Sequence, residues 1–161
     1  MSSEKIYMYF GDVAGNVTEI NHKNWIEISS FEFSTNRNVI QESGNPKRNI
    51  GTPAISKISL TRNMGDSSPG LFLESICGTG QNCIIPFLKG GENMITYIEY
   101  KLENAVISQY KQHKDNASPG AHEQIEISFT SIKTVYTPVD ASGKKGTPLA
   151  IGYDVTGGRR I

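Results

Sequence analysis

Residues 121–137 read AHEQIEISFTSIKTVYT, and this stretch decides the fold of the chain. Ile125, Ile127 and Phe129 alternate with polar residues, a repeat of two that only a β-strand can use to separate a buried face from an exposed face. After Ser131 the apolar positions change parity. One extra residue in the strand, a β-bulge, would keep both halves facing the same core while bending the strand. We therefore expect one long, bent strand, and a sheet curved in this way is typical of a barrel or a sandwich.

The same alternation recurs along the chain and predicts further strands over residues 5–10, 25–33, 55–62, 82–88, 94–111 and 151–155. Segment 25–33 again changes parity midway, and two strands with such a change suggest barrel corners. Segment 94–111 fits either one long bent strand or two strands that meet at Asn104. Strands outnumber helices, so we expect an all-β, mainly antiparallel fold, and a length of 161 residues is most simply one domain over residues 1–161.

One helix of about ten residues is expected after the strand at 55–62. The sequence Asp66-Ser67-Ser68-Pro69 offers N-cap side chains followed by a proline suited to the first helical turn. Glycines at positions 78 and 80 are typical of a helix end. We expect the helix to pack onto the sheet or to plug a barrel end through its apolar stripe, which consists of Leu71, Phe72, Ser75 and Ile76.

The composition excludes several classes of function. Sixteen basic and sixteen acidic residues give a net charge of zero, so no electrostatic footprint for nucleic acid stands out. No run of apolar residues approaches the 18 that a membrane span requires, and we expect no membrane insertion. The first residues lack a cationic and then apolar pattern, so we expect no signal peptide. Cys77 and Cys83 are then expected to be free thiols.

No pattern in the sequence indicates catalysis. The spacing of His22, His113 and His122 is not that of metal ligands, and the two cysteines do not form a C-x-x-C motif. We therefore expect no metal site. The chain has no G-x-S-x-G motif, and its glycine-rich segments at 78–83 and 143–147 lack the spacing of nucleotide-binding loops. We expect no cofactor and a protein that is not an enzyme.

The first strand is apolar on both faces, with Ile6, Met8 and Phe10 on one face and Tyr7 and Tyr9 on the other. Either the strand is covered on both sides within the domain, or the tyrosine face meets another subunit, because tyrosine is enriched at interfaces.

Residues 36–53 show no sustained periodicity, and we expect a long extended loop. A structureless loop of 18 residues is uncommon in a compact domain unless it is functional or disordered. Arg37, Lys47 and Arg48 make the loop basic, with Glu42 as its only acid. It is either a solvated, mobile loop or an arm that contacts a partner.

At this level of detail the chain resembles the Hcp family, the tube proteins of the bacterial type VI secretion system. Five segments carry the resemblance, in the expected order over nearly the whole chain. They are H-K-N-W-I-E-I at 22–28, D-S-S-P-G-L-F at 66–72, L-E-N-A-V-I-S at 102–108, residues 123–136 and A-I-G-Y-D at 150–154.

The resemblance implies a two-sheet β-barrel with one flanking helix and six-membered rings that stack into a tube. A contractile sheath expels the tube with a spike protein and effectors, some of which the lumen can hold. The implied partners are therefore copies of the chain itself, the spike protein, the sheath and the effectors. The implied location is the bacterial cytoplasm during assembly and then the outside or a target cell, without a signal peptide.

In this family the long loop after the second strand reaches toward the adjacent ring. Here the candidate ring-stacking residues are Arg37, Glu42, Asn45, Lys47, Arg48 and Asn49. The candidate residues for contact between subunits are Tyr7, Tyr9 and Tyr153.

Three other interpretations stay open. A β-barrel that carries a small ligand would need an open interior lined by apolar side chains. A hydrolase effector would need an appended domain, for which we expect no room beyond Ile161. A phage tail-tube protein would also assemble from rings into a tube, and only the family resemblance separates that interpretation from the Hcp one.

Overall fold

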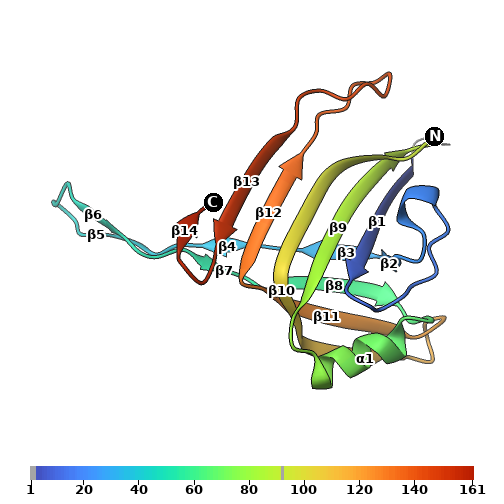
Figure 1. Cartoon of the computed structure of the whole chain (residues 1–161). Helices are drawn as coiled ribbons and strands as arrows, with labels where there is room; N and C mark the ends of the chain where they lie inside the picture. Colours follow the sequence, from blue (N-terminus) through green and yellow to red (C-terminus); the bar gives the residue numbers. More distant parts are fainter. Residues whose placement is uncertain (1–2, 92) are drawn as a thin grey trace.

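A single strand, β10 (Ile95–His113), belongs to both sheets of the fold (Figure 1). The computed structural model describes residues 3–91 and 93–161. The first half of β10 pairs with β12 (Ser131–Tyr136) and the second half with β11 (His122–Ser128), both antiparallel. Between the halves Asn104 has a left-handed φ of 51°, which asparagine tolerates better than most residues. Of the two alternatives for this segment, one long strand with a break in register near Asn104 is therefore the correct one.

The strands on either side of β10 form two antiparallel sheets. Sheet A has the order β14-β13-β12-β10-β9-β1-β2 and sheet B the order β10-β11-β8-β3. The remaining bounds in sheet A are β1 (Ser3–Phe10), β2 (Ile26–Ile28), β9 (Gln81–Gly90), β13 (Leu149–Asp154) and β14 (Arg159–Arg160). Those in sheet B are β3 (Ser30–Glu32) and β8 (Ile58–Asn63). A short 3-10 helix, η1 (Ile20–His22), lies in the connection between β1 and β2.

The two sheets are linked on two sides. On one side β10 runs from sheet A into sheet B. On the other side the chain passes from β2 into β3 through Ser29, whose amide donates a hydrogen bond to the carbonyl of Thr61 at 2.8 Å. The predicted all-β, mainly antiparallel two-sheet barrel is thus confirmed.

The expectation of one continuous strand over residues 121–137 is wrong. Strand β11 ends at Ser128 in sheet B, and β12 begins at Ser131 in sheet A. At the corner the Thr130 amide donates to the Glu103 carbonyl at 3.0 Å. The parity change therefore marks a passage from one sheet to the other and not a bulge inside one strand. The same holds for β2 and β3, where a barrel corner was expected.

The inward residues of both sheets form one core. Apart from Leu71, which lies on the helix, its members alternate along their strands as the sequence predicts, and each member is less than a tenth exposed. They are Met8, Phe10, Ile26, Ile28, Ile58, Leu60, Leu71, Cys83, Ile85, Leu102, Ala105, Ile107, Ile125, Ile127 and Ile132. Cys83 lies in this core and Cys77 on the surface, and both thiols are free, as expected.

The predicted helix is confirmed as α1 (Ser68–Cys77), with Ser67 at the N-cap position and the proline in the first turn. Its packing differs from the expectation. Of the apolar side chains only Leu71 is buried in the core, whereas Phe72 and Ile76 are exposed. The helix flanks the barrel along β10, as the family resemblance implies, but only Leu71 of its predicted apolar stripe reaches the core (Figure 1).

Residues 36–53 are not a structureless loop but most of a β-ribbon, which we call the arm. At its base β4 (Thr35–Asn36) pairs with β7 (Ala54–Ile55), and farther out β5 (Val39–Gln41) pairs with β6 (Arg48–Ile50). The arm extends away from both sheets (Figure 1). Each pairing spans only two or three residues, too short for a repeat of two to stand out in the sequence.

Candidate assembly surfaces

The tip of the arm carries five of the six candidate ring-stacking residues. Glu42, Asn45 and Lys47 lie in the turn, Arg48 and Asn49 lie on β6, and all five are exposed. The Asn45 side chain accepts a hydrogen bond from the Lys47 amide at 3.0 Å, which holds the turn closed.

The arm also exposes apolar side chains. Val39 and Ile50 face each other across its two strands, Ile40 points to the other side, and all three are about half exposed or more. A free two-stranded ribbon is marginally stable in water, and this one exposes three aliphatic side chains close together. The arm therefore has the character of a segment that gains cover from another molecule.

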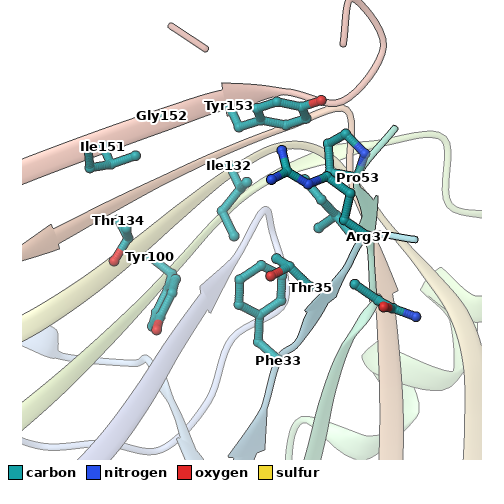
Figure 2. A pocket seen from close by; sticks show the side chains of 12 residues that line it. Phe33, Thr35, Arg37, Pro53, Tyr100, Ile132, Thr134, Ile151, Gly152 and Tyr153 are labelled. Atoms are coloured by element: carbon teal, nitrogen blue, oxygen red, sulfur yellow. The ribbon is translucent and has the colours of Figure 1, made fainter. Parts of the chain in front are cut away.

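At the base of the arm a pocket of about 490 Å³ opens toward sheet A (Figure 2). The sixth candidate stacking residue, Arg37, lines this pocket together with the candidate interface residue Tyr153. Figure 2 shows Phe33, Thr35 and Pro53 contributed by the arm side and Ile132 and Ile151 by sheet A. The lining is otherwise apolar or uncharged, and Arg37 is its one charged member.

Beyond the pocket the inner face of sheet A is not covered. Tyr136 is 47% exposed, Leu149 64% and Ile151 53%. Tyr136 pairs with Leu149, and Thr134 with Ile151, so these side chains share the face that is buried at Ile132 and Leu102. One face of a sheet thus runs from the core of the barrel out to the surface and stays mainly apolar, with Thr134 as its polar member. Such a patch, at the edge of a domain, is typical of a contact surface.

The tyrosines of β1 lie at the opposite end of sheet A and behave differently from each other. Tyr7 is 6% exposed because Val17 and Leu88 pack on it and the His22 ring lies 5.5 Å away. Burial raises the pKa of its phenol, with a smaller contribution from the negative charge of Glu27. At Tyr7 the strand is therefore covered within the chain, as one of the two sequence interpretations had it.

Tyr9 is 38% exposed, and its ring lies 5.6 Å from that of Trp25. Of the two tyrosines on β1 it is the one that can present its side chain to a second molecule. Tyr9 and Tyr153 lie on strands near opposite ends of sheet A, so they cannot belong to one surface (Figure 1).

A buried ion pair, which the sequence did not indicate, lies under α1. Arg62 of β8 donates to the carboxylate of Glu123 of β11, and the two are 5% and 2% exposed. The hydroxyl of Tyr110 donates to the same carboxylate, and burial together with this hydrogen bond raises the pKa of Tyr110. Arg62 also donates to the Glu27 carbonyl at 3.3 Å and to Ser68 at the start of α1 at 3.5 Å.

Metal ions and membranes are the remaining classes of partner. In residues 3–91 and 93–161, no three or more His, Cys, Asp and Glu side chains come together as metal ligands could. In the same part of the chain, no helix is both long and apolar enough to cross a membrane.

Two of the exposed apolar residues beside the pocket, Tyr136 and Leu149, were not predicted as site residues. These two residues are brought together by the pairing of β12 with β13, which can be recognised only when both strands are known.

Comparison with known proteins places the fold and then the family. The chain superimposes on a solved structure of a type six secretion system protein with a TM-score of 0.91 at 22% identity, covering 99% of this chain and 100% of that one. On the crystal structure of Hcp1 from Salmonella typhimurium the TM-score is 0.76 at 19% identity, with 99% of each chain covered.

In sequence, the chain is 24% identical to Protein hcp1 of Pseudomonas aeruginosa over 108 residues, which are 63% of this chain and 64% of that protein. The profile of the family described as "Type VI secretion system effector, Hcp" matches residues 7–136, which include the second half of β1, all of α1 and the whole arm. Because this match spans most of the chain, the protein belongs to the Hcp family of type VI secretion system proteins.

Proposed function

We propose that this chain is the building block of a type VI secretion tube. Six copies close into a ring, rings stack into a tube, and a contractile sheath expels the tube together with a spike protein and effectors. The observation that carries this proposal is the arm, a two-stranded ribbon that reaches out of the barrel with aliphatic side chains exposed on both faces. A segment of this kind is stable when a neighbouring molecule covers it.

The stacking contact is the role we assign to the arm. Its exposed turn carries charged groups of both signs, Glu42 and Lys47, beside Arg48 on β6. Such a tip can pair with a charged rim, while Val39 and Ile50 supply apolar area.

The body of the chain suits a tube wall. Strand β10 runs through both sheets, and the core between them is filled by large aliphatic side chains. A wall built in this way resists bending, because each deformation must break ladder hydrogen bonds or open the close-packed core.

The wider role follows from the family. We propose one domain over residues 1–161, assembly in the bacterial cytoplasm and export through the secretion machine itself. The partners are other copies of the chain, the spike protein, the sheath and effectors held in the lumen. The chain acts as a conduit and carrier, not as an enzyme.

The test is the size and shape of the purified protein. Light scattering after size exclusion should give a mass of about 106 kDa, six times the chain mass of 17.7 kDa. Negative-stain electron microscopy should show annular particles. A monomer at micromolar concentration, with no annulus in any image, would refute the proposal.

A shortened arm separates ring formation from stacking. The Gly51 amide donates to the Asn38 carbonyl at 2.6 Å, so residues 39–50 can be replaced by an Asn-Gly turn that joins the two strands there. We expect this variant to keep the mass of the ring but to form no stacked tubes. Tubes of normal length from the variant would mean that stacking uses another surface.

A second candidate, a β-barrel that carries a small ligand, is favoured by one observation. The pocket at the base of the arm has the volume and the apolar lining of a small-molecule site. A monomer whose melting temperature rises with an apolar ligand would support this function instead.

A further inference from the structure

We propose that the two ends of sheet A bind to each other between neighbouring copies of this chain, with a basic end against an acidic end. This inference rests on the ring proposed above and names the surfaces that form it. The acidic end consists of residues 3–28, which contain β1 and β2. The basic end consists of residues 133–161, which contain most of β12 and all of β13 and β14.

The charges of the chain are separated along the sequence. The acidic end has four acidic and two basic side chains, a net charge of −2, and the basic end has two acidic and five basic side chains, a net charge of +3. Residues 29–132 contain ten acidic and nine basic side chains. The zero net charge of the whole chain therefore hides two ends whose net charges have opposite signs.

The structure places these segments at opposite ends of one sheet (Figure 1). Because β10 and β9 lie between them, the two ends cannot neutralise each other within one molecule. An isologous dimer would bring equal charges together at its two-fold axis. Only a head-to-tail contact brings the basic end of one copy to the acidic end of the next, and such contacts close into rings when the rotation allows it.

Both ends also carry exposed apolar residues. Leu149 and Ile151 are exposed at the basic end, and Tyr9 and Ile20 at the acidic end. Each end thus combines an apolar centre with charged groups, the usual composition of an interface with a polar rim.

The charged groups of the basic end are available. Arg159 and Arg160 are exposed on the edge strand β14, and neither forms an ion pair with another described residue. At the acidic end Glu4 and Glu27 line one surface hollow, where Glu27 meets exposed Lys5 at 3.2 Å. An exposed pair of this kind contributes little, so its carboxylate is free to meet an arginine of a neighbouring copy.

The experiment reverses the charge of each end separately. One variant carries Arg159→Glu and Arg160→Glu, and the other carries Glu4→Lys and Glu27→Lys. We expect each variant alone to have lost the ring, with a dissociation constant at least tenfold higher, because like charges then face each other. Mass is measured by light scattering at low salt, where screening is weakest.

Mixing the two variants gives the decisive result. The first variant has two acidic ends and the second two basic ends, so a one-to-one mixture should form rings in which the variants alternate. Restoration by mixing also proves that both variants fold. The matched control, Lys57→Glu with Lys111→Glu, changes two exposed lysines outside both ends and should leave the ring intact.

The outcomes separate this inference from the proposed function. Rings formed by the wild type and by both variants alone would overturn the assignment of the surfaces while the ring itself stood. Rings lost in both variants and not restored by mixing would also overturn it. A monomeric wild type would overturn both proposals, and uptake of an apolar dye beside Tyr153 by that monomer would mark a ligand site instead.

Discussion

Glu123→Gln is the substitution that most directly tests how the fold is held together. It keeps the size of the side chain and removes its charge, so Arg62 loses the carboxylate on which its buried guanidinium depends. The hydroxyl of Tyr110 loses a charged acceptor at the same time. Because Arg62 also contacts Ser68, the attachment of α1 to sheet B weakens as well.

The magnitude follows from the burial of the pair. Removing one partner of a buried ion pair costs about 3–5 kcal/mol, because the remaining charge stays in the interior without compensation. Some water can reach Arg62, which is 5% exposed, so we expect about 3 kcal/mol at neutral pH. For a chain of this length each kcal/mol lowers the melting temperature by about 2–4 °C, so the expected loss is about 6–12 °C.

Urea denaturation at a fixed protein concentration measures the effect, since self-association would otherwise shift the apparent stability. The control is Glu126→Gln on the same strand, whose side chain has the opposite parity and which should change the free energy of unfolding by less than about 0.5 kcal/mol. The double variant Arg62→Met with Glu123→Leu should recover much of the loss, because it leaves no buried charge. A cost for Glu123→Gln below about 1 kcal/mol would refute the reasoning.

Three other substitutions probe the core, the corner and the first strand. Ile127→Ala should lower the free energy of unfolding by about 2–5 kcal/mol in urea, whereas Ser128→Ala on the same strand should change it little, because only Ile127 is fully buried. Asn104→Val should cost about 1–2 kcal/mol in the same assay, because a β-branched residue resists the φ of 51° at that corner. The pKa of Tyr7 is raised in the folded chain, so the protonated phenol stabilises the fold below about pH 10, and this stabilisation is lost as the pH rises above that value. Tyr7→Phe should therefore flatten the fall in the free energy of unfolding measured between about pH 9 and 12.

The strands and the helix could be predicted because their signals are local. Ile125 and Ile127 show the repeat of two within a few residues, and the proline at 69 stands in the first turn of α1 as its fixed φ favours. Burial of the inward residues then follows from the alternation alone. These elements need no knowledge of their neighbours.

The corners and the arm could not be predicted in the same way. A parity change at Ser131 has two explanations, a bulge or a passage to another sheet, and the choice depends on which strands lie on each side. The arm is held by the pairing of β4 with β7 and of β5 with β6, between residues up to 20 positions apart. Each of these strands is only two or three residues long, so none shows a recognisable alternation of apolar and polar residues in the sequence.

The candidate surfaces were predicted in part for the same reason. Tyr7 and Tyr9 are equivalent in the sequence, yet η1 and its neighbours cover only Tyr7. Tyr136 and Leu149 form one exposed patch across β12 and β13, although 12 residues separate them in the chain. Arg37, chosen for its charge in a loop, lies instead at the wall of the pocket that contains Tyr153.

Net charge illustrates how far a property of the whole chain can mislead about assembly. Electrostatic interactions at physiological salt decay over about 8 Å, so a neighbouring copy responds to the end that it touches and not to the sum over the chain. If only the sum mattered, a chain of zero charge would assemble equally well at all salt concentrations. With ends of −2 and +3 in contact, rings should instead dissociate more readily in about 500 mM than in about 50 mM sodium chloride. The swapped mixture of variants should show the same dependence, because it restores the attraction with the signs exchanged.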